Sequence, residues 1–238
     1  AKLIAASGAG MVAALLVAVV WARLAAAPYE LGAAVAMTSV WGNVGNAGLA
    51  IVAFALGDDA LPIAGLLMVT IHLSSLVLGV GLAQARTSSI TAAAMGALTT
   101  PMSLAGLVAL AVNLLDVDVP LLTERSIGLL ADALIPVMLF TLGLQLVTSG
   151  RPEWSGDLSV VLVAKLAVAP AAAWLAGSAL SLDGDALDAV VIQSAMPPAV
   201  FCAVVASENN LVPDRVTAAV VVATLASALT LPVVLVAL

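Results

Sequence analysis

Charge is scarce in this sequence of 238 residues, of which only 9% are Asp, Glu, Lys or Arg and 63% are hydrophobic. A soluble domain of average composition has about 25% charged residues. The mean hydropathy of +1.23 is correspondingly high. This composition excludes an ordinary soluble domain and is typical of an integral membrane protein.

The residue types that build most catalytic and metal sites are also nearly absent. The chain has one cysteine, Cys202, and one histidine, His72. A lone cysteine forms no internal disulfide, and we expect Cys202 to be a small packing residue. His72 is a candidate proton relay, but we expect it to donate a hydrogen bond to a neighbouring helix. No Gly-rich phosphate loop, metal-ligand cluster or basic stripe is present, so we expect no enzyme, no cofactor and no nucleic-acid partner.

Apolar residues form eight segments, each long enough for a helix of about 20 residues that crosses about 30 Å of hydrocarbon. They cover residues 4–24, 32–57, 61–84, 91–115, 124–148, 157–181, 185–207 and 213–237. Most charges lie in the short connections, which leave no room for a separate soluble domain. The sequence therefore predicts an all-α integral membrane protein with eight transmembrane helices in the lipid bilayer.

Lysine and arginine are divided unequally between the two predicted sides of the membrane. One side receives Arg23, Arg86, Arg151 and Arg215, and the other receives Lys2 and Arg125. Basic residues concentrate in cytoplasmic loops. We therefore expect both ends of this chain on the non-cytoplasmic side of the cell membrane.

Two of the eight segments contain residues that interrupt a membrane helix. The second segment contains Gly42-Asn43-Val44-Gly45-Asn46, and the seventh contains Gln193-Ser194-Ala195-Met196-Pro197-Pro198. Proline removes backbone donors and glycine loosens the backbone. Irregular backbone persists at membrane depth only where it is buried in protein or lines a wet cavity. For either interruption alone, close helix packing is the alternative explanation.

The two interruptions occupy matching places in an internal repeat. When residues 40–62 are laid over residues 191–213, Asn46 falls on Pro197 and Pro62 falls on Pro213. Five crossings separate the copies, so the predicted repeat is inverted, as in many secondary transporters. Residues 1–84 would be the last three helices of a first repeat, and residues 85–238 a second repeat of five helices. Two further helices are then expected before Ala1.

The crossed interruptions are the predicted substrate site. Transporters with inverted repeats bind substrates at discontinuous helices near the bilayer midplane. Half-helix N-termini carry partial positive charge, which favours an anion. The candidate substrate-binding residues are Asn43, Gly45, Asn46, Gln193, Met196, Pro197, Pro198 and Lys165.

Lys165 and Asp132 are ionisable residues inside predicted membrane helices, where charges are rare and mark transport pathways or proton relays. Lys165 lies deep in its segment and would attract a substrate carboxylate or pair with Asp132. Asp132 is a candidate proton or charge relay, with an interfacial position as the alternative. No catalytic or metal-binding residue is predicted.

The runs "AKLAVAPAAAW" and "IQSAMPPAVFCAVVASENNLVP" resemble the auxin efflux carrier family of membrane permeases. "LADALIPVMLFTLGLQL" resembles the seventh helix of that family, and "SVWGNVGNAGLAI" resembles its fourth, without the proline of the family's first crossover. The resemblance implies ten helices in two inverted repeats, with a scaffold domain and a transport domain that moves like an elevator. It also implies that crossed fourth and ninth helices hold an organic anion. This chain would be helices three to ten of a bacterial type.

We therefore predict a secondary transporter of small organic anions, such as mono- or dicarboxylates, that works by elevator-type alternating access. H⁺ and Na⁺ are the candidate coupling ions, and a homodimer is the candidate assembly. A sodium-coupled symporter of the bile-acid type, with Gln193 and freed carbonyls around the ion, is the alternative in the same class. An intramembrane sensor or enzyme is the alternative of another class. The enzyme is disfavoured because the sequence shows no nucleophile with a base, paired aspartates or HExxH motif.

The predicted orientation is tested by cysteine accessibility after Cys202 has been replaced. A cysteine beside Arg86 should resist a membrane-impermeant thiol reagent in intact cells, whereas one at Asp183 should react, because the first loop is predicted to be cytoplasmic. The opposite labelling pattern would overturn the argument from charge bias.

Overall fold

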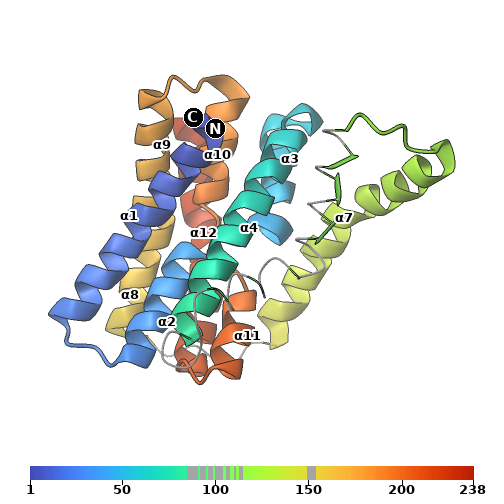
Figure 1. Ribbon diagram of the computed structural model, residues 1–238. Coiled ribbons are helices and arrows are strands. Elements are labelled where there is room, and N and C mark those ends of the chain that lie inside the picture. Colours follow the sequence, from blue (N-terminus) through green and yellow to red (C-terminus); the bar gives the residue numbers. More distant parts are fainter. Residues whose placement is uncertain are drawn as a thin grey trace.

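A computed structural model describes residues 1–84, 115–148 and 154–238, together with isolated positions between 91 and 112. Every regular element in these ranges is a helix (Figure 1). The first range contains α1 (Lys2–Leu24), α2 (Tyr29–Val40), the π-helix η1 (Val44–Leu49), α3 (Ala50–Leu56), the 3-10 helix η2 (Asp58–Ala60) and α4 (Leu61–Gln84). The later ranges contain α7 (Leu121–Thr148), α8 (Gly156–Val163), the π-helix η3 (Ala164–Val168), α9 (Ala169–Ala179), α10 (Gly184–Ser194), α11 (Phe201–Glu208) and α12 (Pro213–Ala237).

Helix α1 packs against α9 through small residues. Its buried face has Ala6, Gly10, Ala14 and Ala18 at every fourth position, and the facing stripe of α9 is Ala169, Ala173 and Gly177. Small residues at this spacing let two helix backbones approach closely, which is how membrane helices associate without a hydrophobic driving force between them. At Gly10 an added Cβ would lie only 2.7 Å from the carbonyl oxygen of Ala169.

Large apolar side chains cover the outer faces of α1 and α12. Val12, Leu16 and Val20 of α1 are exposed, and so are Leu229 and Val233 of α12. An arrangement with small residues inside and large aliphatic residues outside would aggregate in water but suits contact with lipid tails. It supports a membrane-embedded protein.

The structure confirms an all-helical protein, but its described part contains fewer unbroken spans than predicted. Three helical stretches are long and apolar enough to cross a membrane, namely residues 2–24, 156–179 and 213–237. The expected segment 32–57 is divided into α2, η1 and α3, and the expected segment 185–207 into α10 and α11, which is why neither qualifies as one long helix. Most of the segment 91–115 lies outside the described residues.

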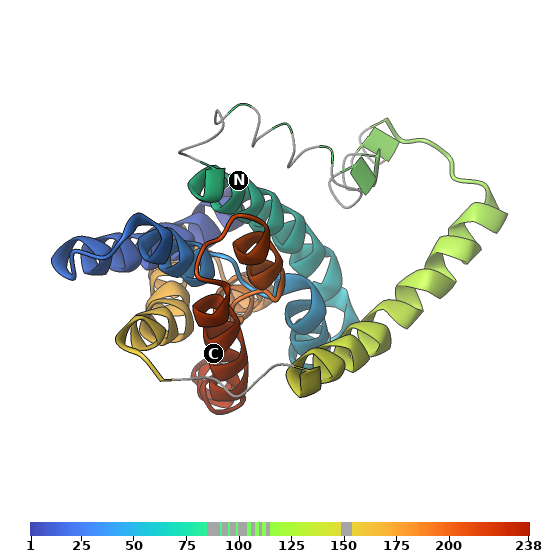
Figure 2. The ribbon, with the colours of Figure 1, turned by 90° about the horizontal axis from the view of Figure 1, so that it is seen from below.

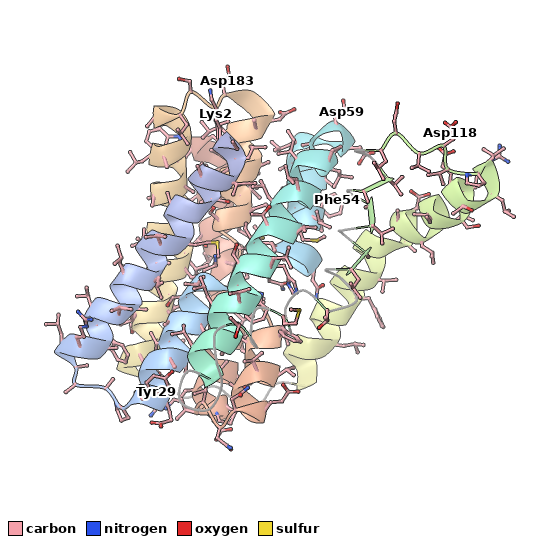
Figure 3. The ribbon with its side chains drawn as sticks, in the orientation of Figure 1. Lys2, Tyr29, Phe54, Asp59, Asp118 and Asp183 are labelled. Carbon is pink, nitrogen blue, oxygen red and sulfur yellow. The ribbon has the colours of Figure 1, made fainter. Side chains whose placement is uncertain are left out.

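Polar residues mark the two ends of the bundle. Lys2, Asp59 and Asp183 lie at one end, and Tyr29 lies at the other (Figure 3). Helix α7 stands apart from the bundle over its N-terminal half, which both ribbon views show (Figures 1 and 2). Elsewhere along its length α7 contacts η1. One cluster of buried apolar residues lies among α1, α4, η1, α9 and α10, and a second lies among α2, α11 and α12.

The contact between α1 and α9 generates a stability prediction. Gly10→Ala should lower the free energy of unfolding by about 1 to 3 kcal/mol, because the new methyl group meets backbone that has little room to move. Gly8→Ala is the matched control, since nothing lies within 4 Å of a Cβ placed there. Thermal melting of both purified variants checks this. Equal melting temperatures would show that the close approach of α1 and α9 is absent.

Candidate functional site

The two interrupted helices meet backbone to backbone. Gly42, in the first interruption, stands opposite Pro198, in the second, in an isolated antiparallel bridge. The backbone N–H of Asn43 donates to the carbonyl oxygen of Pro197 at 2.7 Å, and the N–H of Ala199 donates to the carbonyl oxygen of Trp41 at 2.8 Å. We call residues 41–43 and 197–199 the crossing.

The residue types at the crossing explain why the chain is irregular there. Pro197 and Pro198 have no backbone N–H that needs a partner. Gly42 has no side chain, so the backbone of residues 197–199 can approach it closely. Each hydrogen bond of the crossing satisfies one donor and one acceptor that a continuous helix would have paired internally. In hydrocarbon each unsatisfied group would cost several kcal/mol, so each interruption depends on the other.

The backbone pairing at the crossing differs from the alignment of the two copies but does not test it, because aligned residues of a repeat need not touch. The alignment set Asn46 level with Pro197, and the residue bonded to Pro197 is Asn43. Gly45 and Asn46 instead belong to η1, the π-helix that follows the interruption, where both are half-buried. Such wide turns are frequent at functional sites.

Lys165 also lies in a π-helix, η3, and reaches the crossing from the side. Its side chain is 3% exposed, and its Nζ donates to the carbonyl oxygen of Ser194 at 3.2 Å. Ser194 is the last residue of α10, so this carbonyl has no partner within the helix. A Cβ on Gly42 would lie 3.0 Å from Nζ, so the lysine adjoins both interruptions.

Two amide side chains near the crossing keep a polar atom without a partner in the described structure. Asn43 is 6% exposed, and its Nδ2 has no hydrogen-bond partner. Gln193 is fully buried; its Nε2 donates to the carbonyl oxygen of Ala64 at 3.3 Å, while its Oε1 is unpaired. Buried polar atoms are normally satisfied, so such exceptions mark places where a ligand or water completes the bonding.

The Gln193 side chain fits only because Gly48 faces it. A Cβ on Gly48 would lie 2.1 Å from Oε1 of Gln193. Gly48 belongs to η1 and Gln193 to α10, so this contact joins the helices on either side of the crossing.

An aromatic cluster borders the crossing. The Trp41 ring packs edge-on against Phe201, with ring centroids 5.2 Å apart, and against His72 of α4, with centroids 5.6 Å apart. Edge-to-face contacts of this kind are favourable. We expected His72 to donate a hydrogen bond to a neighbouring helix, whereas the contacts described for it are to these two rings.

The other residues that the sequence singled out make different contacts. Met196 is fully buried and packs in the hydrophobic core. Asp132 is exposed on α7 and makes no described ion pair with Lys165. Cys202 is a free, buried cysteine packed among apolar residues, as expected. Among the described residues no group of His, Cys, Asp or Glu has the arrangement of a metal site.

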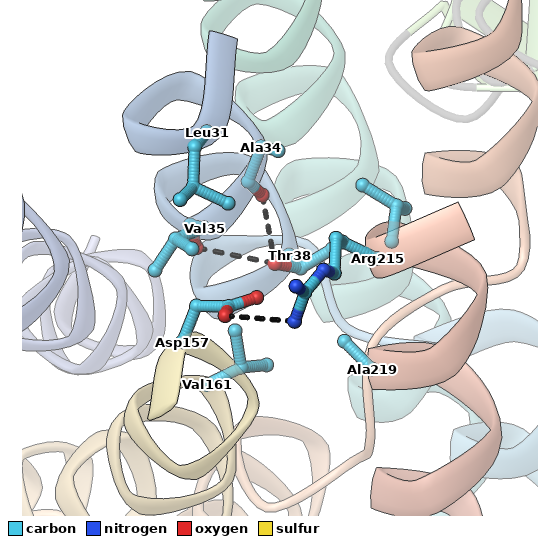
Figure 4. Close-up of a pocket in the computed structure, with 9 residues that line it drawn as sticks. Leu31, Ala34, Val35, Thr38, Asp157, Val161, Arg215 and Ala219 are labelled. Carbon is cyan, nitrogen blue, oxygen red and sulfur yellow. Dashed lines mark hydrogen bonds and ion pairs between the residues drawn. The ribbon is translucent and has the colours of Figure 1, made fainter. Parts of the chain in front are cut away.

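A second polar contact was not predicted from the sequence. Arg215 of α12 pairs with Asp157 of α8 at 3.4 Å, beside a pocket of about 10 Å³ that is large enough for one water (Figure 4). The Thr38 hydroxyl of α2 also borders this pocket but donates to the Ala34 carbonyl of its own helix at 2.8 Å. Arg215 and Asp157 are 58 residues apart, so no local sequence pattern signals the pair.

Comparison with known proteins places the chain among transporters. The family described as membrane transport protein matches residues 85–235. Auxin efflux carrier component 1 of Arabidopsis thaliana is 32% identical over 108 residues, which are 44% of this chain and 17% of that protein. The uncharacterized transporter YfdV of Escherichia coli K12 is 26% identical over 198 residues, which are 80% of this chain and 63% of that protein. The chain thus matches less than two thirds of the length of each relative.

The contact between Gly48 and Gln193 is tested by a double-mutant cycle. Gly48→Ala should lower the melting temperature because the methyl group displaces a fully buried amide, whereas Gly65→Ala on α4 meets nothing within 4 Å. In a Gln193→Ala background Gly48→Ala should be tolerated, since the colliding atom is gone. We expect a coupling free energy of about 0.5 to 3 kcal/mol. Additive effects would contradict the contact.

Proposed function

Because this chain belongs to the auxin efflux carrier family of membrane transport proteins, we propose that it is part of a secondary transporter that carries small organic anions across a membrane. The crossing is the proposed binding site. The observation that carries the proposal is an unpaired donor, Nδ2 of Asn43, buried where two interrupted membrane helices meet. Transporters bind their substrates at this kind of junction.

The charge balance of the crossing favours an anion. The half-helices that leave the crossing, η1 with α3 on one side and α11 on the other, present N-terminal ends, which carry partial positive charge. Asn43 adds a neutral donor and Lys165 adds a formal positive charge. No described carboxylate forms an ion pair with Lys165. A carboxylate substrate would therefore find donors and positive potential without a competing negative group.

The order of helices supports an inverted repeat. A long helix, an interrupted helix and a second long helix follow one another in α1, α2 with α3, and α4. The same order recurs in α8 with α9, α10 with α11, and α12. The two interrupted helices run antiparallel where they meet. Repeats of opposite orientation allow a transporter to open alternately to the two sides around one site.

We propose that the crossing moves as one unit in an elevator-type cycle. Its parts are joined by the paired backbones and by the contacts of Lys165 and Gln193, so they are suited to move together. A sodium-coupled symporter is the second candidate function, and the unpaired Oε1 of Gln193, a possible ion ligand, is the observation in its favour. A homodimer remains the proposed assembly.

Uptake into proteoliposomes by the full-length protein tests the function. Labelled mono- and dicarboxylates should accumulate faster than in empty vesicles and should compete with one another. Comparing uptake with and without a sodium gradient separates the two candidates. No uptake of any organic anion under either condition would contradict both.

Binding is predicted to depend on the amides at the first interruption. Asn43→Leu and Asn46→Leu should each weaken substrate affinity roughly tenfold to a hundredfold, because a hydrogen bond to a charged group contributes about 1.5 to 3 kcal/mol. Asn209→Leu is the matched control, since Nδ2 of Asn209 donates to the carbonyl oxygen of Val205 in its own helix. Ligand-induced shifts in melting temperature measure all three. Unchanged affinity in both test variants would mean that these amides serve helix packing.

A further inference from the structure

We propose that a pocket between the C-terminal end of α1 and the N-terminal end of α2 binds an anionic phospholipid, with the lipid phosphate against Arg23 and the acyl chains along the outer face of α1. Residues on both sides of the turn that joins the two helices line this pocket, which we call the turn pocket. It is separate from the crossing. The proposal therefore does not rest on the transport function proposed above.

The first support is the size and lining of the turn pocket. Its volume is about 620 Å³, within the range of about 300 to 1,000 Å³ that is usual for small-molecule sites. Most of the lining is apolar, and small residues such as Ala22 of α1 and Gly32 and Ala33 of α2 leave the space open. Such a pocket suits a lipid headgroup together with the apolar chains attached to it.

The walls of the turn pocket are held in place by hydrogen bonds. The Tyr29 hydroxyl at the start of α2 donates to the carbonyl oxygen of Leu82 near the end of α4, and both residues line the pocket. In the turn itself the N–H of Ala27 donates to the carbonyl oxygen of Ala22 at 2.9 Å. The pocket is therefore built by three helices whose ends are bonded to one another.

The second support is the charge around the turn pocket. Arg23 lies in the last turn of α1, lines the pocket and takes part in no ion pair among the described residues. The first turn of α2 also lines the pocket, and a helix N-terminus carries partial positive charge. Glu30 belongs to that first turn but does not line the pocket. Arginine binds phosphate oxygens through two parallel hydrogen bonds, so the pocket is suited to a phosphate group.

The opposite partial charge at the C-terminal end of α1 is reduced by the turn. The carbonyl oxygens of Trp21, Ala22 and Arg23 accept N–H groups of the turn residues. The partial charge of a helix end resides on the groups that have no partner. The bonded end of α1 therefore opposes an anion less than an open helix end would.

The third support is the level of the turn pocket in the membrane. Tyr29 lies at one end of the bundle (Figure 3), and Trp21 lies in the last turn of α1. Tryptophan and tyrosine concentrate at the two membrane–water interfaces. Val12, Leu16 and Val20 of α1 are exposed, so they extend an apolar surface from this end toward the bilayer interior. A phosphate at Arg23 and acyl chains along α1 would each lie at their usual depth in the bilayer.

The charge bias of the loops indicates which lipid to expect. It predicts that this end of the bundle is cytoplasmic, with Arg23 among the basic residues of that side. The cytoplasmic leaflet contains anionic lipids, and basic pockets between membrane helices bind their headgroups. The expected ligand is therefore an anionic phospholipid rather than a zwitterionic one.

Thermal melting of the purified full-length protein in detergent tests the proposal. Phosphatidylglycerol should raise the melting temperature above the value in an equal amount of phosphatidylcholine, because a lipid in the turn pocket binds the folded state. The difference should grow with lipid concentration. Arg23→Gln should raise the phosphatidylglycerol concentration for half-maximal stabilisation roughly tenfold to a hundredfold, the loss expected for a hydrogen bond to a charged group.

Matched variants separate the site from general effects of charge and bulk. Arg125→Gln is the control for Arg23→Gln, because Arg125 is an exposed arginine of α7 that does not line the pocket. Val19→Trp tests the space itself, since Val19 lines the pocket and a large ring there would fill it while Arg23 is retained. Val20→Trp is its control, because Val20 is exposed and does not line the pocket. Both controls should keep the preference for phosphatidylglycerol, and Val19→Trp should lose it.

Equal stabilisation of the wild type by the two lipids would overturn the proposal, and so would the wild-type preference in Arg23→Gln or in Val19→Trp. Soluble glycerol phosphate distinguishes the source of the phosphate. If it stabilises the protein at the concentrations at which phosphatidylglycerol acts, the pocket is a site for a free phosphate ester and the proposal is wrong. These melts contain no organic-acid substrate, so their outcome is separate from the uptake and Asn43 experiments.

Discussion

The structure depends on one constraint, which is that backbone groups released inside a membrane must find partners within the protein. Two helices in the described part of the chain are interrupted, and each supplies the partners that the other lacks. The bonds from Asn43 to Pro197 and from Ala199 to Trp41 are the direct expression of this. Neither interruption would be tolerated alone, so the two halves of the described chain are held together at their least regular points.

The surrounding residues are adapted to the same constraint. Gly48 leaves space for the buried amide of Gln193, and Gly42 leaves space for Lys165. Lys165 in turn bonds the final carbonyl of α10, a group that a continuous helix would have satisfied. Two of the buried polar atoms that remain unpaired in the described structure, the Nδ2 of Asn43 and the Oε1 of Gln193, lie beside the crossing and give a ligand something to bind.

Sequence reasoning identified the two interruptions and the buried lysine because helix-breaking residues and charges stand out in an apolar chain. It began the first interruption correctly at Gly42 but extended it too far, because Gly45 and Asn46 have the composition of a break but lie in a π-helix, which has no simple sequence signature. It also had no means of finding the Gly48–Gln193 contact or the Arg215–Asp157 pair, since both join residues far apart in the chain. Composition predicts which residues are unusual, and only packing shows which of them meet.

We propose that a substrate anion binds at the crossing, and the sharpest measurement of this is protection of a neighbouring cysteine from thiol labelling. In the full-length protein with Cys202 replaced, Val200→Cys follows the crossing directly at a half-buried position, whereas Asp183→Cys lies at the end of the bundle (Figure 3). Labelling rates would be measured with and without each carboxylate that the protein takes up. A transported carboxylate should slow labelling at position 200 and leave position 183 unchanged. Equal rates at position 200 with and without a transported carboxylate would mean that the anion does not bind at the crossing.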